Sequence, residues 1–176
     1  MPAYLLNAPI GFQGDVTRPD ETNVEPAMLV GVGSPPVYPV AFGLAMKYVA
    51  GGVQQFNGGS ETAPSFAGIL VREIPQIGAS STYDSQSTVT ADVPNPVQVQ
   101  GLCVRGYALV PCTHGTPARG GTVYVQIVAD TGAIVGSFRA DGTDGGDAVA
   151  LTATQAEWAS DGVDAATGLA EIRIFR

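Results

Sequence analysis

Short runs of alternating apolar and polar residues, separated by glycine- and proline-rich turns, recur along the whole chain. The longest run covers residues 97–110. Val97 and Val99 alternate with glutamines, and after Gly101 the small or apolar residues move to the even positions. A strand that changes its buried face needs a break in its pleat, and glycine commonly supplies one. We therefore predict a long central strand that bends at Gly101 and is shared between two sheets or two sides of a small barrel.

Further strands are predicted on both sides of this central one. Alternation and short apolar runs place them at residues 37–49, 66–73, 122–128, 133–138, 148–153 and 169–175. One helical turn is expected around Trp158, and residues 74–95, rich in Ser, Thr, Asp and Pro, are expected to form a long exposed loop. No sustained helical period is present. The predicted fold class is therefore all-β, as a jelly-roll-like sandwich or a small barrel.

Residues 1–27 have the pattern of an extended N-terminal arm, which leaves residues 28–176 as the β-rich domain. Prolines interrupt the arm, and each removes a backbone donor and favours extended geometry in the residue before it. Its apolar side chains are too many for a free tail, and they are predicted to contact a partner: Tyr4, Leu5, Leu6, Ile10 and Phe12. Packing of the same side chains on the arm's own domain is the alternative.

Composition excludes several classes of partner and of binding site. Charged residues make up only 14% of the 176 residues and the net charge is −8, with no cluster of Lys and Arg to neutralise phosphates, so we expect no nucleic-acid partner. The N-terminus lacks the pattern of a signal peptide, and no apolar window is long enough for a bilayer. We therefore expect a protein made in a cytoplasm, with no membrane partner. One histidine and two cysteines make a zinc site or a disulfide framework improbable.

Three stretches resemble catalytic or metal-binding motifs, and each has a simpler explanation. Asp-Thr-Gly-Ala at 130–133 is similar to the active-site loop of dimeric aspartic proteases, but the same residues are typical of a hairpin tip. The acidic loop at 141–147 lacks the spacing of a calcium loop. Cys112 and His114 have no evident orienting partner. We predict that the protein is not an enzyme.

The order of the motifs resembles the capsid cement, or decoration, proteins of tailed bacteriophages. The resemblance runs from about Met28 onward. It includes YPVAFGLAM followed by two glycines, FAGILVRE from Phe66, VRGYALV in the central strand, and a strand at 120–125 before a glycine hairpin. Each motif is weak alone, and their order and spacing carry the likeness.

This resemblance implies a structural protein on the capsid exterior, made in the cytoplasm of a bacterial host. It would bind the major capsid protein, fasten neighbouring capsomers and stabilise the mature shell, with no enzymatic activity and no cofactor. Self-association as a homodimer or a homotrimer is expected at a symmetry axis of the shell. Two alternatives stay open: a carbohydrate- or host-surface-binding β-module with Tyr83 and Trp158 as aromatic contacts, and a dimeric aspartic protease using Asp130.

Overall fold

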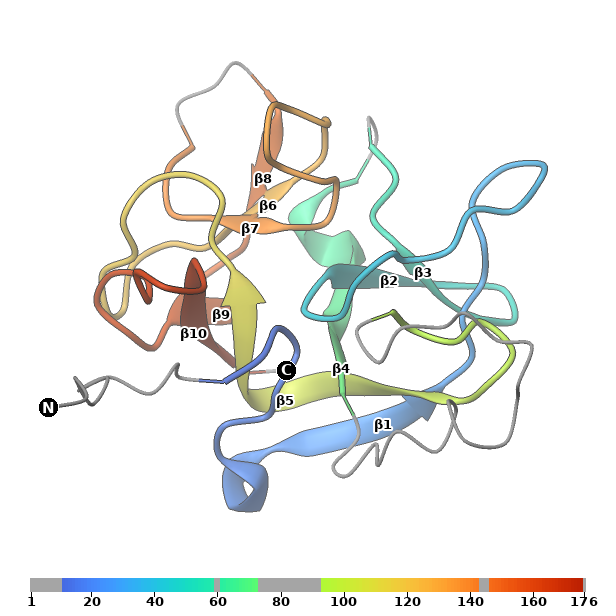
Figure 1. Ribbon diagram of the computed structural model, residues 1–176, viewed down its shortest axis with the longest axis horizontal. Helices are drawn as coiled ribbons and strands as arrows, with labels where there is room; N and C mark the ends of the chain where they lie inside the picture. Colours follow the sequence, from blue (N-terminus) through green and yellow to red (C-terminus); the bar gives the residue numbers. More distant parts are fainter. Residues whose placement is uncertain (1–10, 59–60, 73–92, 143–145, 176) are drawn as a thin grey trace, which may run out of the picture.

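A computed structural model describes residues 11–58, 61–72, 93–142 and 146–175 (Figure 1). This part of the chain contains no α-helix, and thus none that could span a bilayer; its helical pieces are two short 3-10 turns, η1 (Pro19–Glu21) and η2 (Ala63–Ser65). The predicted all-β class is confirmed. The strands are β1 (Asn23–Ala27), β2 (Ala45–Val49), β3 (Gly52–Gln55), β4 (Phe66–Val71), β5 (Gln100–Pro111), β6 (Tyr124–Gln126), β7 (Phe138–Arg139), β8 (Ala148–Ala150), β9 (Ala156–Trp158) and β10 (Leu169–Ile174).

Backbone pairing in the first half of the chain runs in a closed ring, which we call the first barrel. The strands lie in the order β3-β2-β4-β5, and β1 pairs antiparallel with the other edge of β5. Just after β1 the chain pairs with β3, since Val53 N–H donates to Met28 O (2.8 Å) and Val30 N–H donates to Val53 O (2.8 Å). The ring encloses a small apolar core of Leu29, Phe42, Met46, Val53, Ala67, Leu70, Leu102 and Val104.

A second ring, the second barrel, shares β5 with the first. The second half of β5 pairs with β10, β10 pairs with β9, and Trp158 N–H in β9 donates to Gly121 O (3.2 Å) just before β6. β8 and β7 flank β6, and Thr113 N–H, just beyond β5, donates to Phe138 O in β7 (2.9 Å). Its core continues onto the outer face of β4 and includes Ile69, Val110, Val125, Phe138, Trp158 and Ile172.

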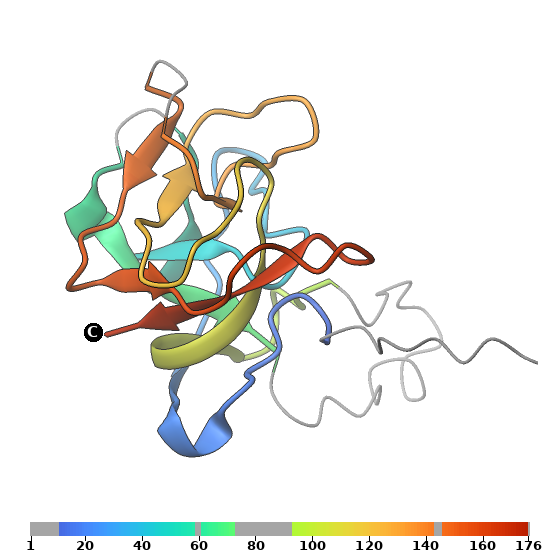
Figure 2. The ribbon, with the colours of Figure 1, turned by 90° about the vertical axis from the view of Figure 1, so that its left-hand side faces the viewer.

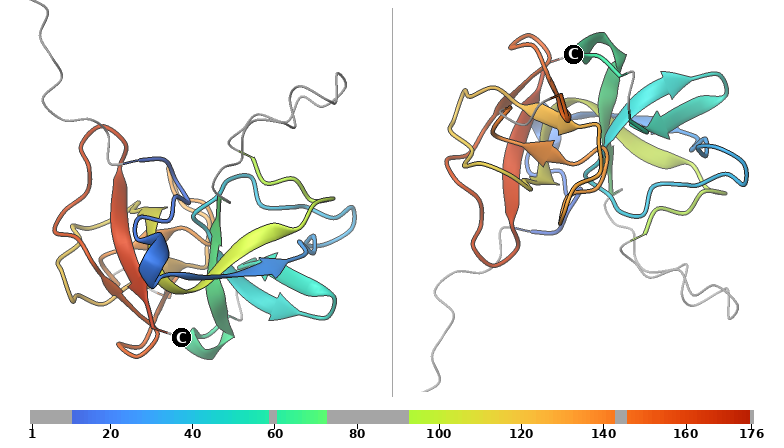
Figure 3. Two further views of the ribbon diagram at one scale, coloured as in Figure 1. Left: turned by 90° about the horizontal axis from the view of Figure 1, so that it is seen from below. Right: turned by 90° about the horizontal axis from the view of Figure 1, so that it is seen from above.

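The central strand bends at Gly106 rather than at Gly101, which corrects the predicted position. Cys103 and Ala108 contribute to the same core although they are five residues apart, so the pleat changes phase between them. Gly106 has φ +119°, and a Cβ there would lie 2.5 Å from Thr22 Cα, so glycine is required at this point. Figure 2 shows β5 curving through this region. Figure 3 shows the β2–β3 hairpin and β10 on opposite sides of β4 and β5.

Two predicted strands are shorter in the structure. β5 begins at Gln100, because residues 95–98 form a turn in which Val97 N–H donates to Asn95 Oδ1 (3.1 Å). Val97 is accordingly 81% exposed, whereas Gln100 is buried. β2 begins only at Ala45, after a loop that is held to β4 by a bond from Gly43 N–H to Leu70 O (2.7 Å).

Trp158 lies in strand β9, so the predicted helical turn is wrong. Its indole Nε1–H donates to Thr122 O (3.0 Å), and Ile172 is its register partner in β10. The strands expected at 66–73, 122–128, 148–153 and 169–175 are present with narrower bounds. The strand expected at 133–138 is wrong for most of its length, because residues 134–137 form turn and loop and only Phe138 of this range lies in β7. β7 pairs with β6 as in the predicted hairpin. Most of the predicted loop at 74–95 lies outside the described residues, since its description begins at residue 93.

The described part of the predicted arm lies along β5. Gly14 N–H donates to Leu109 O (2.8 Å), Val16 forms a bridge with Ala108, and β1 then follows the first half of β5. Four of the five predicted partner contacts, Tyr4, Leu5, Leu6 and Ile10, lie outside the described residues. Phe12 is described and 66% exposed. The division at residue 27 stays a prediction.

Candidate interaction site

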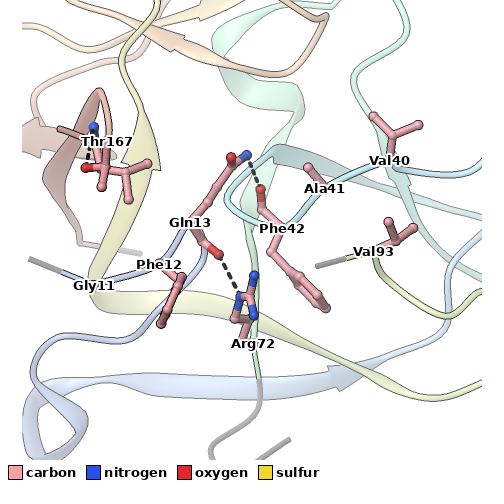
Figure 4. A pocket seen from close by; sticks show the side chains of 10 residues that line it. Gly11, Phe12, Gln13, Val40, Ala41, Phe42, Arg72, Val93 and Thr167 are labelled. Atoms are coloured by element: carbon pink, nitrogen blue, oxygen red, sulfur yellow. Dashed lines mark hydrogen bonds between the residues drawn. The ribbon is translucent and has the colours of Figure 1, made fainter. Parts of the chain in front are cut away.

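An open pocket of about 410 Å³ lies where the N-terminal turn, the loop before β2, the end of β4 and the loop before β10 meet. We call it the N-terminal pocket and define it by Phe12, Val40, Phe42, Arg72 and Val93 (Figure 4). The described ranges of the chain begin or end at three points on its rim: residues 11, 72 and 93. The pocket therefore lies at the base of the predicted arm.

The N-terminal turn is fixed by its own hydrogen bonds and by close backbone contact. Phe12 N–H donates to Asp15 Oδ2 (2.8 Å), and Asp15 N–H donates to Phe12 O (3.0 Å). Gly14 and Gly43 both have left-handed backbones, and a Cβ on Gly14 would lie 3.0 Å from Gly43 N. Only glycine at these positions lets the turn pack directly on the loop before β2.

Arg72 forms the floor of the pocket at the end of β4. Its Nε–H donates to Gln13 O (3.0 Å), and the Gln13 amide donates to Phe42 O (2.6 Å). The guanidinium carbon lies 5.5 Å from the Phe12 ring centre and 5.3 Å from the Phe42 ring centre, within the range of cation–π attraction. In Figure 4 the two rings lie on either side of Arg72. Charge, aromatic rings and backbone therefore hold this floor together.

The walls of the pocket expose apolar surface. Phe12 is 66% exposed, Val40 58% and Val93 38%. Arg72 is the only charged side chain among the described residues that line the pocket, and Asp15 Oδ1 lies 4.0 Å from its Nε. The pocket thus offers apolar contact with little net charge. Its described lining is mostly apolar, with Gln13, Arg72 and Thr167 as the polar side chains, so it can make apolar contact with a partner.

Sequence reasoning placed Phe12 among the partner contacts, but it missed the other residues of the pocket. Sequence reasoning assigned Val40 and Phe42 to one strand and Arg72 to another. Positions 12, 42, 72 and 93 are about 20 to 30 residues apart in sequence and meet only through the barrel pairing. The one local signal is an arginine at the end of the otherwise apolar run 66–71.

The Asp-Thr-Gly segment is a hairpin tip and not half of a protease site. Asp130 and Ala133 exchange two backbone hydrogen bonds (3.2 and 3.0 Å), and Asp130 Oδ1 accepts from Thr131 N–H (2.5 Å). Gly132 has φ +83°, as such a turn requires. The carboxylate is half-exposed and pairs with His114, whose Nε2 lies 3.6 Å from Asp130 Oδ2. Nothing in this arrangement would activate water.

The remaining candidates also have structural roles. The Cys112 Sγ–H donates a hydrogen bond to His114 O (3.5 Å). Burial raises the pKa of this thiol to about 11, so it is not a thiolate at neutral pH. Asp141 at the start of the acidic loop pairs with the buried Arg139, with 2.9 Å between Oδ1 and Nε. Among the described residues no three His, Cys, Asp or Glu side chains lie together as a metal site would need.

The aromatic contacts suggested for a sugar-binding module are not available as a pair. Trp158 is 1% exposed and lies in the core of the second barrel. Tyr83 lies outside the described residues. Trp158 therefore cannot serve as an exposed aromatic contact.

Comparison with known proteins gives a family match and a structural match. A family model described as the XM1 gp53 minor capsid protein matches residues 1–174. A chain in the solved capsid of Myoviridae phage XM1 superposes with a TM-score of 0.62 and 18% sequence identity, covering 97% of this chain and 94% of that one. At this identity the structural match shows a shared fold. No curated protein sequence matches.

Proposed function

The chain belongs to the XM1 gp53 minor capsid protein family, and from this premise we propose that it is a cement protein that binds the outer surface of a phage capsid. In this role it fastens neighbouring capsomers and stabilises the mature shell. The family is structural and not enzymatic. The observation that carries the proposal is the exposed apolar pocket at the base of an apolar N-terminal segment, on a body closed by two rings of backbone pairing.

The physics of cementing favours this arrangement. A fastener must contact at least two neighbours, and it must resist deformation between its contacts. The two barrels share β5, so a continuous paired strand joins them rather than a linker. Several weak contacts on one particle raise the effective concentration of each further contact, which gives avidity without a large interface. Exposed apolar groups such as Phe12 and Val40 become favourable once a lattice covers them.

The proposed partners follow from this role. The major capsid protein supplies the lattice, and self-association as a homodimer or homotrimer places copies around a symmetry axis. The predicted arm contacts Tyr4, Leu5, Leu6, Ile10 and Phe12 are proposed to bind across the joint between subunits. The protein is made in the cytoplasm of a bacterial host and ends on the exterior of the virion.

The test is co-sedimentation with assembled shells, combined with heat resistance of the particles. The full chain should sediment with shells at a fixed ratio to the major capsid protein and should raise the temperature at which the shells break. Deletion of residues 1–10 should lower both occupancy and heat resistance. The matched control is Ile134→Asp, which changes an exposed apolar residue near the hairpin tip and should leave both unchanged. Failure of the full chain to sediment with shells would contradict the proposal.

A further inference from the structure

We infer that the N-terminal pocket receives residues 1–10 of a second copy of this chain, so that neighbouring copies are linked by exchange of their N-terminal segments. The inference rests on the proposed function, because it names the contact by which copies would be linked on a shell. It is carried by three properties of the described residues: what lines the pocket, where the chain enters the structure, and how the entry turn is fixed.

The chemistry of the pocket matches that of the segment. Residues 2–10 carry no charged side chain and include Tyr4, Leu5, Leu6 and Ile10. The pocket exposes Phe12, Val40 and Val93, and its one charged floor residue, among those described, lies beside Asp15. Burial of such a segment would remove apolar surface from water at both partners, which favours association. It would bury no unpaired charge in the pocket, and so it would avoid the usual cost of burial at such sites.

The length and exit point of the segment favour a neighbour. Ten residues in extended form reach about 33–36 Å. A compact chain of this size has a radius of gyration of about 16 Å. The segment leaves the described structure at Gly11, on the rim of the pocket itself, so most of its length would be surplus if it only filled the pocket beside its own root.

The entry turn also opposes filling by the same chain. The root of the segment, Gly11, lines the pocket beside Phe12, whose ring forms a wall. Phe12 N–H is already held by Asp15 Oδ2 (2.8 Å). This bond fixes the turn, and a segment that arrives from a second copy is not attached to it. Exchange of identical elements between copies is a low-cost route to association.

Net charge makes a separate prediction. Each chain carries −8, so two copies repel each other at low ionic strength. An apolar contact between them should therefore strengthen as salt screens this repulsion, whereas a contact held by ion pairs would weaken.

Chemical cross-linking between two single-cysteine variants tests the inference in the full chain. One variant carries Leu6→Cys and the other Val40→Cys, both with Cys112→Ser; Cys103 is buried, and burial raises its thiol pKa to about 12, so it is retained. Mixing the two with a bismaleimide can form heterodimers only between copies. We expect heterodimers in solution and on shells, in a yield that rises with salt. Ile134→Cys replaces Val40→Cys in the control, which should give only background.

A charge placed in the pocket gives the second readout. With Val93→Cys as the acceptor, an added Val40→Asp should lower the cross-link yield at equal concentration about tenfold or more, because a carboxylate would be buried against the apolar segment. Ile134→Asp should leave the yield unchanged.

Three results would overturn the inference. One is a heterodimer yield at the control level, and another is a yield that does not respond to Val40→Asp. The third is cross-linking of a doubly substituted Leu6→Cys, Val40→Cys chain only within monomers. Sedimentation of the same variants with shells separates the two proposals. Binding to shells without exchange removes the inference and keeps the cement role, whereas exchange without binding removes the cement role.

Discussion

The two barrels share β5 but differ in what they bury and what they expose. The second barrel holds the larger apolar core, with Trp158 and Phe138 fully buried in it. The first barrel encloses a smaller core, and the apolar side chains of Val40 and Phe12 stay exposed beside it. The proposed function therefore assigns stability and binding to different side chains. Variants in the second-barrel core should lower the free energy of unfolding, whereas variants at the exposed pocket residues Phe12 and Val40 should mainly change association.

The largest expected effect comes from Trp158→Ala. The indole is 1% exposed and its removal leaves a cavity in the second barrel, together with the unpaired Thr122 O, so we expect a loss of about 3–5 kcal/mol in the free energy of unfolding. Chemical denaturation measures it. Trp158→Phe, which retains most of the ring volume, should cost clearly less. Equal losses for both variants would show that the cavity is not the cause.

The next effect tests the strand that joins the barrels. Gly106→Ala adds a Cβ at φ +119° beside Thr22, and we expect a loss of about 1–3 kcal/mol. Gly51→Ala is the matched control, because Gly51 also has a left-handed backbone (φ +92°) but has open space around the new Cβ. It should cost less in the same denaturation experiment. If Gly51→Ala cost as much, contact with Thr22 would carry no part of the effect.

A smaller, pH-dependent effect is expected at Glu61 beside the first barrel. Burial alone would raise the pKa of this carboxyl, but bonds from Lys47 Nζ (2.7 Å) and Asn57 N–H (2.9 Å) outweigh it, and the net pKa is lowered from 4.5. A carboxyl whose pKa is lower in the folded state stabilises the protein at pH values above its unfolded-state pKa. This stabilisation is lost as the pH falls through its folded-state pKa.

Denaturation between pH 7 and pH 3 checks this contribution. Glu61→Gln removes the titrating group and should flatten the acidic part of the stability curve. Glu157→Gln, at a half-exposed pair with Arg173, should change the curve less. If the stability of Glu61→Gln fell at low pH as much as that of the unsubstituted protein, this carboxyl would not be the cause of the fall.

The smallest effect on stability should come from Phe12→Ala. The ring is 66% exposed, so the free energy of unfolding should change by only about 0.5 kcal/mol. Occupancy on shells should nevertheless fall, since the ring forms a wall of the pocket. Val97→Ala, at an 81% exposed residue outside the pocket lining, should change neither quantity. A loss of stability in Phe12→Ala with normal occupancy would reverse the assignment of roles.

Sequence patterns located much of the fold, because local alternation reports which residues face a core. They identified β4, β10 and the hairpin at Asp130, and they predicted a central strand that changes phase. They placed the bend at Gly101, since Val97 and Val99 imitate a strand, although the turn after Asn95 exposes both valines. Alternation alone does not distinguish an exposed turn from a strand edge.

The pocket could not be located in the same way. Its walls and floor come from residues that local patterns assign to separate elements, and only ring closure brings Phe42 and Arg72 beside Phe12. The residue pairs that close the first ring, such as Leu29 with Val53, are far apart in sequence and leave no periodic signal. Two local signals point to the pocket: the apolar content of the N-terminus, which includes Phe12, and the arginine at the end of the run 66–71.

The strand shared by both barrels has a mechanical consequence. Tension applied across the molecule would pass along the covalent backbone of Gln100–Pro111, rather than through a side-chain interface between two lobes. Neighbouring segments run antiparallel along much of its length, so a pull along its axis loads many hydrogen bonds in shear at once. Such a body would elongate little before it ruptures, which suits a shell that is pressed outward by packaged genome.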